Sequence, residues 1–350
     1  MNSLNNTVDK LKNGESVTDT ELLGLLSAEG DDLRYLTESA AEVCLENYGR
    51  DIYVRGLIEI SSYCKNDCLY CGIRRSNRAA ERYRLTPDEI VACADAGYAL
   101  GFRTFVLQGG EDAYYTDALL CDIVRHLKNK YPDSAITLSV GERSRESYAA
   151  LKEAGADRYL LRHETADEYH YAMLHPKELT LRSRMKCLSD LKDLGYQTGC
   201  GFMVGSPGQT KEHILKDLRF IEHFKPHMVG IGPFIPHKDT PFAEKDAGSV
   251  DMTLRCLAIV RLMLPEVLLP ATTALGSIEN GGRSRGILVG ANVVMPNLSP
   301  EDVRGKYLLY NNKLATGVES AEGLSELDRE MRSIGRRVVC ARGDHISIQK

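Results

Sequence analysis

Short apolar segments alternate with amphipathic segments through most of this 350-residue sequence, and this alternation limits the fold more than any other feature. Eight segments have the apolar, β-rich character of strands: 52–60, 103–108, 135–140, 157–162, 197–204, 227–232, 267–271 and 291–295. Helical patterns follow most of them, which predicts a parallel sheet. Eight such units predict a complete (βα)8 TIM-type barrel, with functional residues on the loops after the strands. A doubly wound open sheet is the alternative that the pattern leaves open.

The predicted barrel covers residues 51–300, and the parts on either side of it have different patterns. Residues 1–50 carry apolar residues at helical spacing, with a possible capping box at Thr18 and Glu21, and predict an N-terminal helical extension. Residues 301–350 are polar with little periodicity and predict a C-terminal tail.

The composition is that of an ordinary globular protein, with 43% apolar residues, 27% charged residues and a net charge of −5. No segment approaches the ~20 apolar residues that a membrane span needs, and the polar N-terminus lacks the apolar part of a signal peptide. We therefore expect a cytoplasmic protein without a membrane segment. The acidic balance and the lack of a basic run argue against nucleic-acid binding.

Three cysteines, Cys64, Cys68 and Cys71, follow the first predicted strand in a C-x3-C-x2-C pattern. Three thiolates can bind three irons of a [4Fe–4S] cluster, which usually takes four cysteines. The fourth iron would then be open to the amino and carboxylate groups of S-adenosylmethionine (SAM), whose one-electron cleavage releases a 5′-deoxyadenosyl radical. A zinc site is the alternative, although structural zinc usually takes four ligands.

The other seven cysteines stand alone in the sequence, and free cysteine behaves as a small buried apolar residue. They are Cys44, Cys93, Cys121, Cys187, Cys200, Cys256 and Cys340.

The chain resembles the radical SAM superfamily, in its biotin-synthase-like branch, and within that branch the HydE-type [FeFe]-hydrogenase maturases. The segments that carry the resemblance are CLYCGIRRSN (68–77), QGGED (108–112), YLLRHETAD (159–167), GFMVGSPGQT (201–210), VGIGPFIPHKDTPFA (229–243), LPATTALGSI (269–278) and GANVVMPNLSP (290–300). The resemblance implies a complete barrel, with the cluster and SAM at one mouth and a cavity running through it.

The resemblance also implies a role in building the two-iron subcluster of [FeFe]-hydrogenase. The substrate would be a cysteine-ligated iron carbonyl cyanide from the maturase HydG, attacked at its cysteine sulfur, and the product would pass to the maturase HydF. A low-potential donor such as ferredoxin or flavodoxin would supply the electrons.

The cofactor-binding residues that the resemblance implies are Tyr70, Gln108, Gly109, Gly110, Glu111, Ser139, Glu164, Arg184 and Ile231. Glycines let a backbone approach a ligand closely. A carboxylate suits ribose hydroxyls, and an arginine offers a fork to a carboxylate. Plain turns, buried ion pairs and ordinary core packing are the alternatives. His163 alternates with its neighbours and is expected to face the helix layer.

The substrate-binding residues that the resemblance implies are Arg162, Thr272, Thr273, Met295, Tyr307 and Tyr310. Hydroxyl and phenol groups can donate hydrogen bonds to carboxylate, cyanide or carbonyl groups without adding charge. Helix capping and packing are the alternatives for these positions.

One feature departs from some relatives, which carry a second, C-terminal cysteine triad. The corresponding stretch here, residues 311–331, has no cysteine, so we predict a single cluster. The rival within the same class is methylornithine synthase, and the segments GPFIPHKDTP and PATTALG favour the maturase. A non-catalytic iron–sulfur or zinc protein is the rival from another class.

Overall fold

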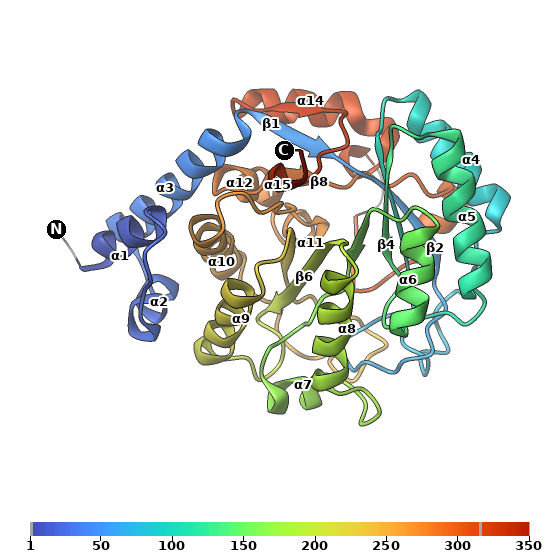
Figure 1. The fold of residues 1–350 in the computed structure, drawn as a ribbon. Helices are drawn as coiled ribbons and strands as arrows, with labels where there is room; N and C mark the ends of the chain where they lie inside the picture. Colours follow the sequence, from blue (N-terminus) through green and yellow to red (C-terminus); the bar gives the residue numbers. More distant parts are fainter. Residues whose placement is uncertain (1–2, 315–316, 350) are drawn as a thin grey trace.

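Parallel strands form the centre of the computed structural model, which describes residues 3–314 and 317–349 (Figure 1). Six strands pair in sequence order: β2 (Gly56–Ser61), β3 (Thr104–Gly109), β4 (Ala135–Ser139), β5 (Arg158–Leu160), β6 (Gln197–Val204) and β7 (Met228–Pro233). All of these pairings are parallel, which confirms the predicted parallel α/β arrangement. The strand order lacks the reversal of a doubly wound sheet, so that alternative is wrong.

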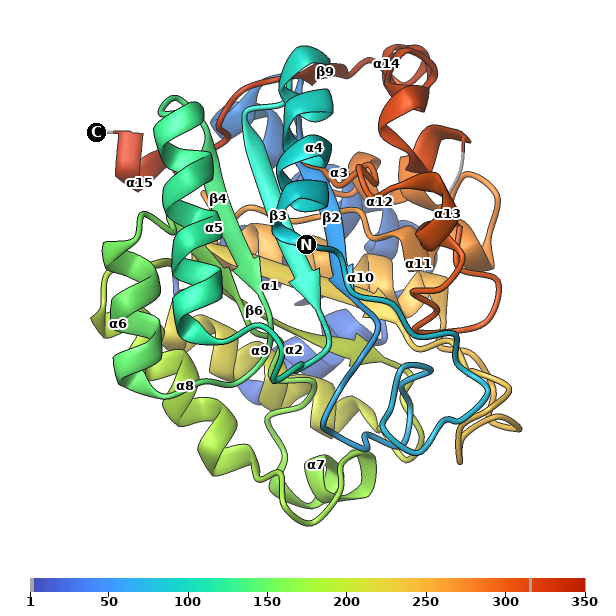
Figure 2. The same cartoon turned by 90° about the vertical axis from the view of Figure 1, so that its right-hand side faces the viewer.

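Helices lie on the outer side of the sheet between successive strands (Figure 2). They are α4 (Pro87–Ala99), α5 (Asp117–Lys130), α6 (Arg145–Glu153), α7 (Glu168–Leu174), α8 (Leu181–Asp193), α9 (Lys211–Phe224) and α10 (Val250–Met263). Helix α4 begins as the sequence predicts, with Pro87 in its first turn and a reciprocal capping box between Thr86 and Glu89. The short α7 was not predicted; Asp167 caps it by accepting a hydrogen bond from the backbone of His170.

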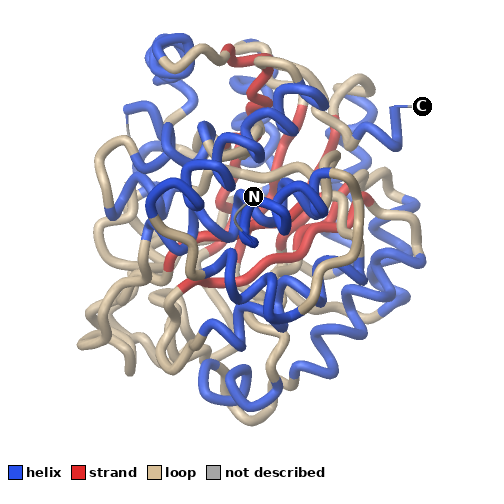
Figure 3. Tube along the Cα trace, turned by 90° about the vertical axis from the view of Figure 1, so that its left-hand side faces the viewer, coloured by secondary structure: helices blue, strands red, loops and turns tan. Residues whose placement is uncertain are grey.

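The N-terminal extension is helical, as predicted, and lies against the outer helices (Figure 3). Its helices are α1 (Ser3–Lys12), α2 (Asp19–Leu26) and α3 (Gly30–Tyr48). The capping box between Thr18 and Glu21 is present at the start of α2. Helix α3 packs on α10 and α2 contacts both α9 and α10, so the extension covers this side of the molecule.

The first predicted strand, 52–60, is two strands in the structure. Strand β1 (Asp51–Val54) pairs with β8 (Val293–Val294) and β9 (Arg337–Val339), whereas β2 pairs with β3. The two strands separate at the buried Arg55, whose Nη1 lies 3.0 Å from Met228 Sδ. The change of pairing partner, which no local pattern reveals, explains the difference.

The predicted strands at 267–271 and 291–295 are shorter than expected. Between β7 and β8, single parallel bridges join Met228 to Leu268 and Pro270 to Val293. A third bridge joins Leu57 of β2 to Asn297, which follows β8. Proline has no backbone N–H to give to a ladder, so Pro270 interrupts regular pairing at this point. The remaining helices here are α11 (Thr273–Ile278) and α12 (Gly282–Leu288).

The C-terminal part is folded, which corrects the expectation of a tail. It forms α13 (Glu301–Arg304), two short 3-10 turns, α14 (Leu324–Ser333), β9 and α15 (Ile346–Gln349). Leu327 and Met331 of α14 are fully buried, and β9 adds a parallel strand beside β1. The segment was hard to predict because its strand pairs with β1 and its polar side chains contact β5 and β6, which lie far away in the sequence.

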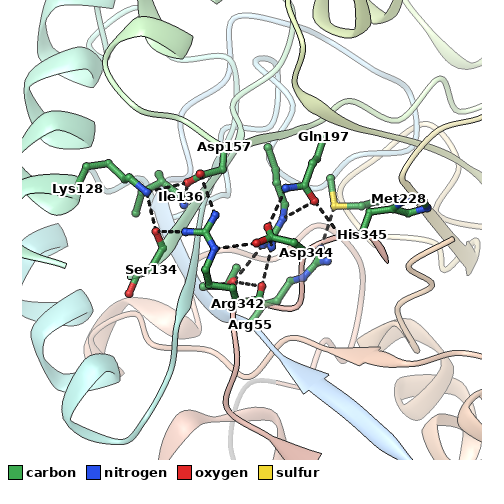
Figure 4. A network of polar contacts seen from close by, with 12 residues as sticks. Arg55, Lys128, Ser134, Ile136, Asp157, Gln197, Met228, Arg342, Asp344 and His345 are labelled. Carbon is green, nitrogen blue, oxygen red and sulfur yellow. Dashed lines mark hydrogen bonds and ion pairs between the residues drawn. The ribbon is translucent and has the colours of Figure 1, made fainter. Parts of the chain in front are cut away.

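A polar network joins the C-terminal part to the amino ends of the central strands (Figure 4). The fully buried Arg158 of β5 donates through Nη2 to Asp344 Oδ1 at 2.6 Å and to the carbonyl of Arg342 at 2.6 Å. Gln197 of β6 donates to the same Asp344 oxygen at 2.7 Å. Burial alone would raise the pKa of Asp344, but Arg158, Arg342 and Gln197 together lower it to about 2.

We expect Asp344→Asn to destabilise the fold by about 3 kcal/mol, because it leaves the buried Arg158 without its anion. The carboxylate's contribution is full above its unfolded-state pKa, near 3.8, and is lost as the pH falls toward 2. The variant's deficit should therefore shrink between about pH 5 and pH 2. Urea unfolding across this range measures it, with the exposed Asp246→Asn as control. Equal stability of the two variants at pH 7 would contradict the prediction.

Candidate functional site

The three cysteines lie on a loop without helix or strand, residues 62–84, called here the cysteine loop. It connects the carboxyl end of β2 to α4. The Arg82 guanidinium holds the loop together by donating to four backbone carbonyls. They belong to Ile73 (2.9 Å), Arg74 (2.7 Å), Asn77 (3.0 Å) and Ser62. Arginine alone offers five donors in one plane, which suits a loop whose carbonyls lack ladder partners.

An ion pair between Arg74 and Asp67 fixes the segment between the first two cysteines. Asp67 accepts from Arg74 Nε at 2.7 Å and from the backbone of Ser76 at 3.0 Å. Burial works against the charged carboxylate, but these hydrogen bonds outweigh it and lower the pKa of Asp67 to about 2. The loop is therefore shaped by charged hydrogen bonds on both sides of Cys68.

The thiols of Cys64, Cys68 and Cys71 are partly exposed and near enough to one another to interact electrostatically. Burial raises the pKa of all three, that of Cys71 to about 12, and the pKa of Cys68 is raised further by its two neighbours. Cysteine binds metal as the thiolate, so the charge of the bound metal ions has to offset the burial that raises these pKa values. Over residues 3–314 and 317–349, no three His, Cys, Asp or Glu side chains are already gathered closely enough to hold an ion.

The Gly-Gly turn after β3 packs directly under the cysteine loop. A Cβ on Gly110 would lie 2.1 Å from the carbonyl oxygen of Tyr63 and 2.8 Å from Cys64 Cβ. The Gly110 N–H donates to the Ser61 carbonyl, and the Lys65 N–H donates to the Glu111 carbonyl at 2.8 Å. Any other residue at position 110 would displace the first cysteine.

Glu111 lies at the edge of this turn with a side chain that is 9% exposed. Its Oε1 accepts from the Glu142 N–H at 3.0 Å. Its Oε2 is 3.1 Å from Lys65 Nζ but has no well-aligned hydrogen bond in the described part of the chain. A cleft of about 410 Å³ opens beside it, and its lining includes Glu142 and Arg143. One carboxylate oxygen is thus available to an ammonium group at the end of β3.

Glu164 follows β5 in a left-handed conformation, with φ of 65°. A non-glycine residue there is uncommon and often marks a functional site. Its N–H donates to the Gly201 carbonyl at 3.0 Å, and its Oε2 lies 3.0 Å from Arg162 Nη2. That pair has the distance of an ion pair but not the angles of a hydrogen bond, so both atoms retain hydrogen-bonding capacity.

Arg184 of α8 is linked to the same cluster. Its Nε donates to Glu142 Oε1 at 2.6 Å and its Nη1 donates to the carbonyl of Arg162 at 2.6 Å. Ser139 ends β4 directly opposite Gln108 of β3. The structure therefore brings Gln108, Ser139 and the group of Arg162, Glu164 and Arg184 to the carboxyl ends of neighbouring strands.

His163 faces the helix layer, as expected from its alternation. Its Nε2 lies 3.2 Å from Asp217 Oδ1 of α9, and both side chains are fully buried. Burial lowers the pKa of His163 to about 3 and raises the pKa of Asp217 well above its ordinary value. The pair accepts from two backbone N–H groups, that of Ala166, two residues after Glu164, and that of Gly201 on β6, whose carbonyl accepts from the Glu164 N–H.

Two other predicted cofactor residues have mainly packing contacts. Ile231 of β7 is fully buried in the main core. The Tyr70 hydroxyl lies 3.3 Å from His175 Nε2, beside the second and third cysteines. Their predicted contacts with SAM stay predictions.

The predicted substrate residues lie in two places. Thr272, Thr273 and Met295 line a small cavity of about 10 Å³ together with Arg283 and Glu319, which form an ion pair. The hydroxyl of Thr273 donates to Glu319, whereas the buried hydroxyl of Thr272 has no partner in the described residues.

The two predicted tyrosines lie on the segment after α13. Tyr307 is buried against Gln108 and near Glu59, while burial raises the pKa of Tyr310 to about 12. Tyr310 interacts electrostatically with Arg162.

An ion pair at the carboxyl ends of the strands was not predicted from the sequence. Glu59 of β2 is fully buried, accepts from Asn297 Nδ2 at 2.9 Å, and lies 2.5 Å from Lys313 Nζ. The Lys313 side chain is 8% exposed. A carboxylate inside an apolar strand signals a polar partner, but nothing in the sequence points to Lys313.

Comparison with known proteins identifies the family of this chain. Residues 58–221 match the Radical SAM superfamily. The chain is 44% identical over 302 residues to the [FeFe] hydrogenase maturase subunit HydE of Thermotoga maritima, covering 86% of each chain. This chain belongs to the HydE family of radical SAM enzymes.

More distant relatives agree with the HydE-family fold. The 3-methylornithine synthase of Methanosarcina acetivorans is 29% identical over 333 residues, covering 94% of this chain and 91% of that relative. The crystal structure of methylornithine synthase (PylB) superposes with a TM-score of 0.85 at 27% identity, covering 95% of this chain and 97% of that one. The structure of the maturase HydG, at 19% identity, superposes with a TM-score of 0.81, covers 97% and 76% of the two chains, and shares the fold. Within the described residues, no helix is long and apolar enough to cross a membrane.

We expect Arg82→Ala to reduce the iron bound after anaerobic reconstitution at least severalfold, because four loop carbonyls lose their donor. Hydrogen bonds to a charged group are worth about 1.5–3 kcal/mol each, so the loop would lose its shape while the sheet remains folded. Arg78→Ala, an exposed arginine of the same loop, is the matched control. Iron and sulfide per chain measure the effect, and equal iron in both variants would rule out this role for Arg82.

Proposed function

We propose that this chain is a HydE-type maturase that uses one [4Fe–4S] cluster and SAM to act on a cysteine-ligated iron carbonyl cyanide precursor. The product would enter the two-iron subcluster of [FeFe]-hydrogenase. The main support is the 44% identity to the Thermotoga maritima HydE over 86% of both chains. HydG and HydF are the proposed partner maturases, a low-potential carrier is the proposed donor, and the cytoplasm is the proposed location.

The proposed scaffold is a complete eight-stranded barrel. Backbone hydrogen bonds support closure: Val229 donates to Leu268, Ala271 to Val293, and Leu57 to Pro296. The segments around 268–271 and 293–298 would be the seventh and eighth strands of the barrel, between β7 and β2. Closure would gather the carboxyl ends of all eight strands around one mouth.

The residues present fit the implied cofactors. Cys64, Cys68 and Cys71 would hold the cluster, and the loop supplies three thiols with no fourth cysteine beside them. Two buried carboxylate atoms that lack hydrogen bonds, Oε2 of Glu111 and Oε2 of Glu164, are ready acceptors for the ammonium and hydroxyl groups of SAM. When bound, the cluster and SAM would supply a 5′-deoxyadenosyl radical.

The residues of the chain itself would orient the bound SAM and exclude water. Glu142 and the Arg162 carbonyl fix Arg184, which would direct its charge toward a carboxylate. The His163–Asp217 pair holds the backbone after Glu164 and its partner Gly201 on β6, so that the strained conformation of Glu164 persists. Such fixed groups need no reorganisation when the reaction occurs.

An anionic substrate fits the polar groups beside this site. Arg162 has two buried nitrogens, Nε and Nη2, without hydrogen bonds among the described residues, and its charge suits the carboxylate of a cysteine-derived ligand. Tyr310 interacts electrostatically with Arg162, and the hydroxyl of Thr272, in the small cavity, has no hydrogen-bond partner among the described residues. Lys313 adds a second cation, whose charge Glu59 offsets.

Methylornithine synthase is the rival function, favoured by the similarity to PylB in fold over nearly the whole chain. The identity to those relatives, 27–29%, is well below the identity to HydE. Supplying L-lysine separates the two functions, because only the rival would rearrange an amino acid.

We expect dithionite-reduced, cluster-loaded protein to cleave SAM to 5′-deoxyadenosine, and to form no rearranged amino acid from L-lysine. Glu164→Gln should lower the rate by about tenfold or more, since it weakens one acceptor for SAM without changing its size. Chromatography of the products measures both. A rearranged amino acid would overturn the maturase assignment, and a cluster-loaded sample without cleavage would overturn the radical SAM mechanism.

A further inference from the structure

The cysteine loop is strongly basic in an acidic protein. Its residues 62–84 carry six cations and two anions, whereas the whole chain has a net charge of −5. The cations are Lys65, Arg74, Arg75, Arg78, Arg82 and Arg84, and the anions are Asp67 and Glu81. Positive charge is therefore concentrated in the segment that would hold the cluster.

Only some of these cations bind groups of the loop itself. Arg82 binds loop carbonyls and Arg74 pairs with Asp67, so both serve the loop itself. Arg75 and Arg78 are exposed and have no ion-pair partner anywhere in residues 3–314 and 317–349. Folding of the loop does not require these two arginines.

Two more cations of the loop present their charge to solvent while their anions stay buried. The side chain of Lys65 is 61% exposed and its partner Glu111 is 9% exposed. The side chain of Arg84 is 38% exposed and its partner Asp112 is 3% exposed. An approaching molecule thus meets the cations, and the exposed anion of the loop is Glu81.

Exposed aromatic rings lie in the same surface. Tyr63 and Tyr114 are 37% and 42% exposed, and the Arg84 guanidinium lies 4.0 Å and 5.2 Å from their ring centroids. Tyrosine and arginine are the residue types enriched in protein interfaces and their energetic hot spots. Tyr63 directly precedes Cys64, so this group lies next to the first cysteine.

We propose that this basic face, made of Tyr63, Lys65, Arg75, Arg78, Arg84 and Tyr114, docks an acidic one-electron carrier protein with a flavin or an iron–sulfur centre. The inference rests on the proposed function, because a radical SAM cluster needs one electron for each cleavage. The carrier is oxidised by one electron, the cluster held by the three cysteines is reduced by one, and no atom is transferred.

Charge and rigidity both support this partner. A positive surface steers an acidic protein to the loop that carries the cysteines, and raises the association rate by about 10- to 1,000-fold. The Arg82 hydrogen bonds and the two-pronged Arg84–Asp112 pair fix the face before binding. A fixed face has little ordering entropy to lose on docking.

The test is the double variant Arg75→Glu/Arg78→Glu, probed with a strongly acidic flavodoxin. The matched control, Arg50→Glu/Arg329→Glu, makes the same charge change at two exposed arginines. Helix α14, which carries Arg329, and the start of β1, which follows Arg50, lie at the end of the molecule opposite the cysteine loop (Figures 1 and 2).

The first readout is binding of oxidised flavodoxin to the cluster-free protein at low and high salt. We expect the double variant to bind at least tenfold more weakly than the control at low salt, and to lose most of the salt dependence. Equal affinity of the two variants would overturn the proposal.

The second readout compares two reductants for the cluster-loaded protein. Cleavage of SAM driven by reduced flavodoxin should fall at least tenfold in the double variant, whereas cleavage driven by excess dithionite should not change. Equal loss with both reductants would assign the arginines to the loop and overturn the docking role. Failure of wild-type protein with dithionite would instead defeat the proposed function, while the binding measurement would still test the face.

Discussion

The contacts of one guanidinium group, that of Arg82, determine the shape of the loop on which the proposed chemistry depends. The loop has no helix or strand to satisfy its carbonyls, and four of them converge on this side chain. Close backbone contacts complete the arrangement, because Gly110 lets the Tyr63 carbonyl approach and Gly72 lets the Leu308 carbonyl approach. These contacts thus fix the loop that carries both the cysteines and the basic surface.

The two ends of the parallel strands are organised by different polar groups. At the carboxyl ends, ion pairs that include Arg162–Glu164, Arg184–Glu142 and Lys313–Glu59 leave several atoms with unused hydrogen-bonding capacity. At the amino ends, Arg158, Gln197 and Asp344 are joined by short hydrogen bonds that close the structure with the C-terminal segment. Unused hydrogen-bonding capacity suits a binding site, whereas the short hydrogen bonds of Arg158, Gln197 and Asp344 suit a structural role.

The sequence predicted the features that depend on local pattern. The strand–helix alternation, the capping box at Thr18 and the direction of His163 all follow from spacing, and the structure agrees with them. The cysteine motif and its flanking segments pointed to the radical SAM superfamily, which the comparisons confirm.

The features that were not predicted from the sequence share a physical cause, which is contact between segments that lie far apart in the chain. Arg55 divides the first strand because β1 pairs with β8 and β9 from the far end of the chain. The C-terminal segment contacts Arg158 and pairs with β1, both of which lie far from it in the sequence. Lys313 reaches Glu59 across 254 positions of sequence, a separation that no local pattern can reveal.

The central claim is that three cysteines of one loop hold a single cluster with one iron open to SAM. Electron paramagnetic resonance of the reduced, reconstituted protein tests it most directly, with Cys71→Ala and the exposed Cys340→Ala as a matched pair. We expect one [4Fe–4S]⁺ signal that changes shape when SAM is added, is lost in Cys71→Ala and is retained in Cys340→Ala. An unchanged signal in Cys71→Ala, or a wild-type signal that does not respond to SAM, would contradict it.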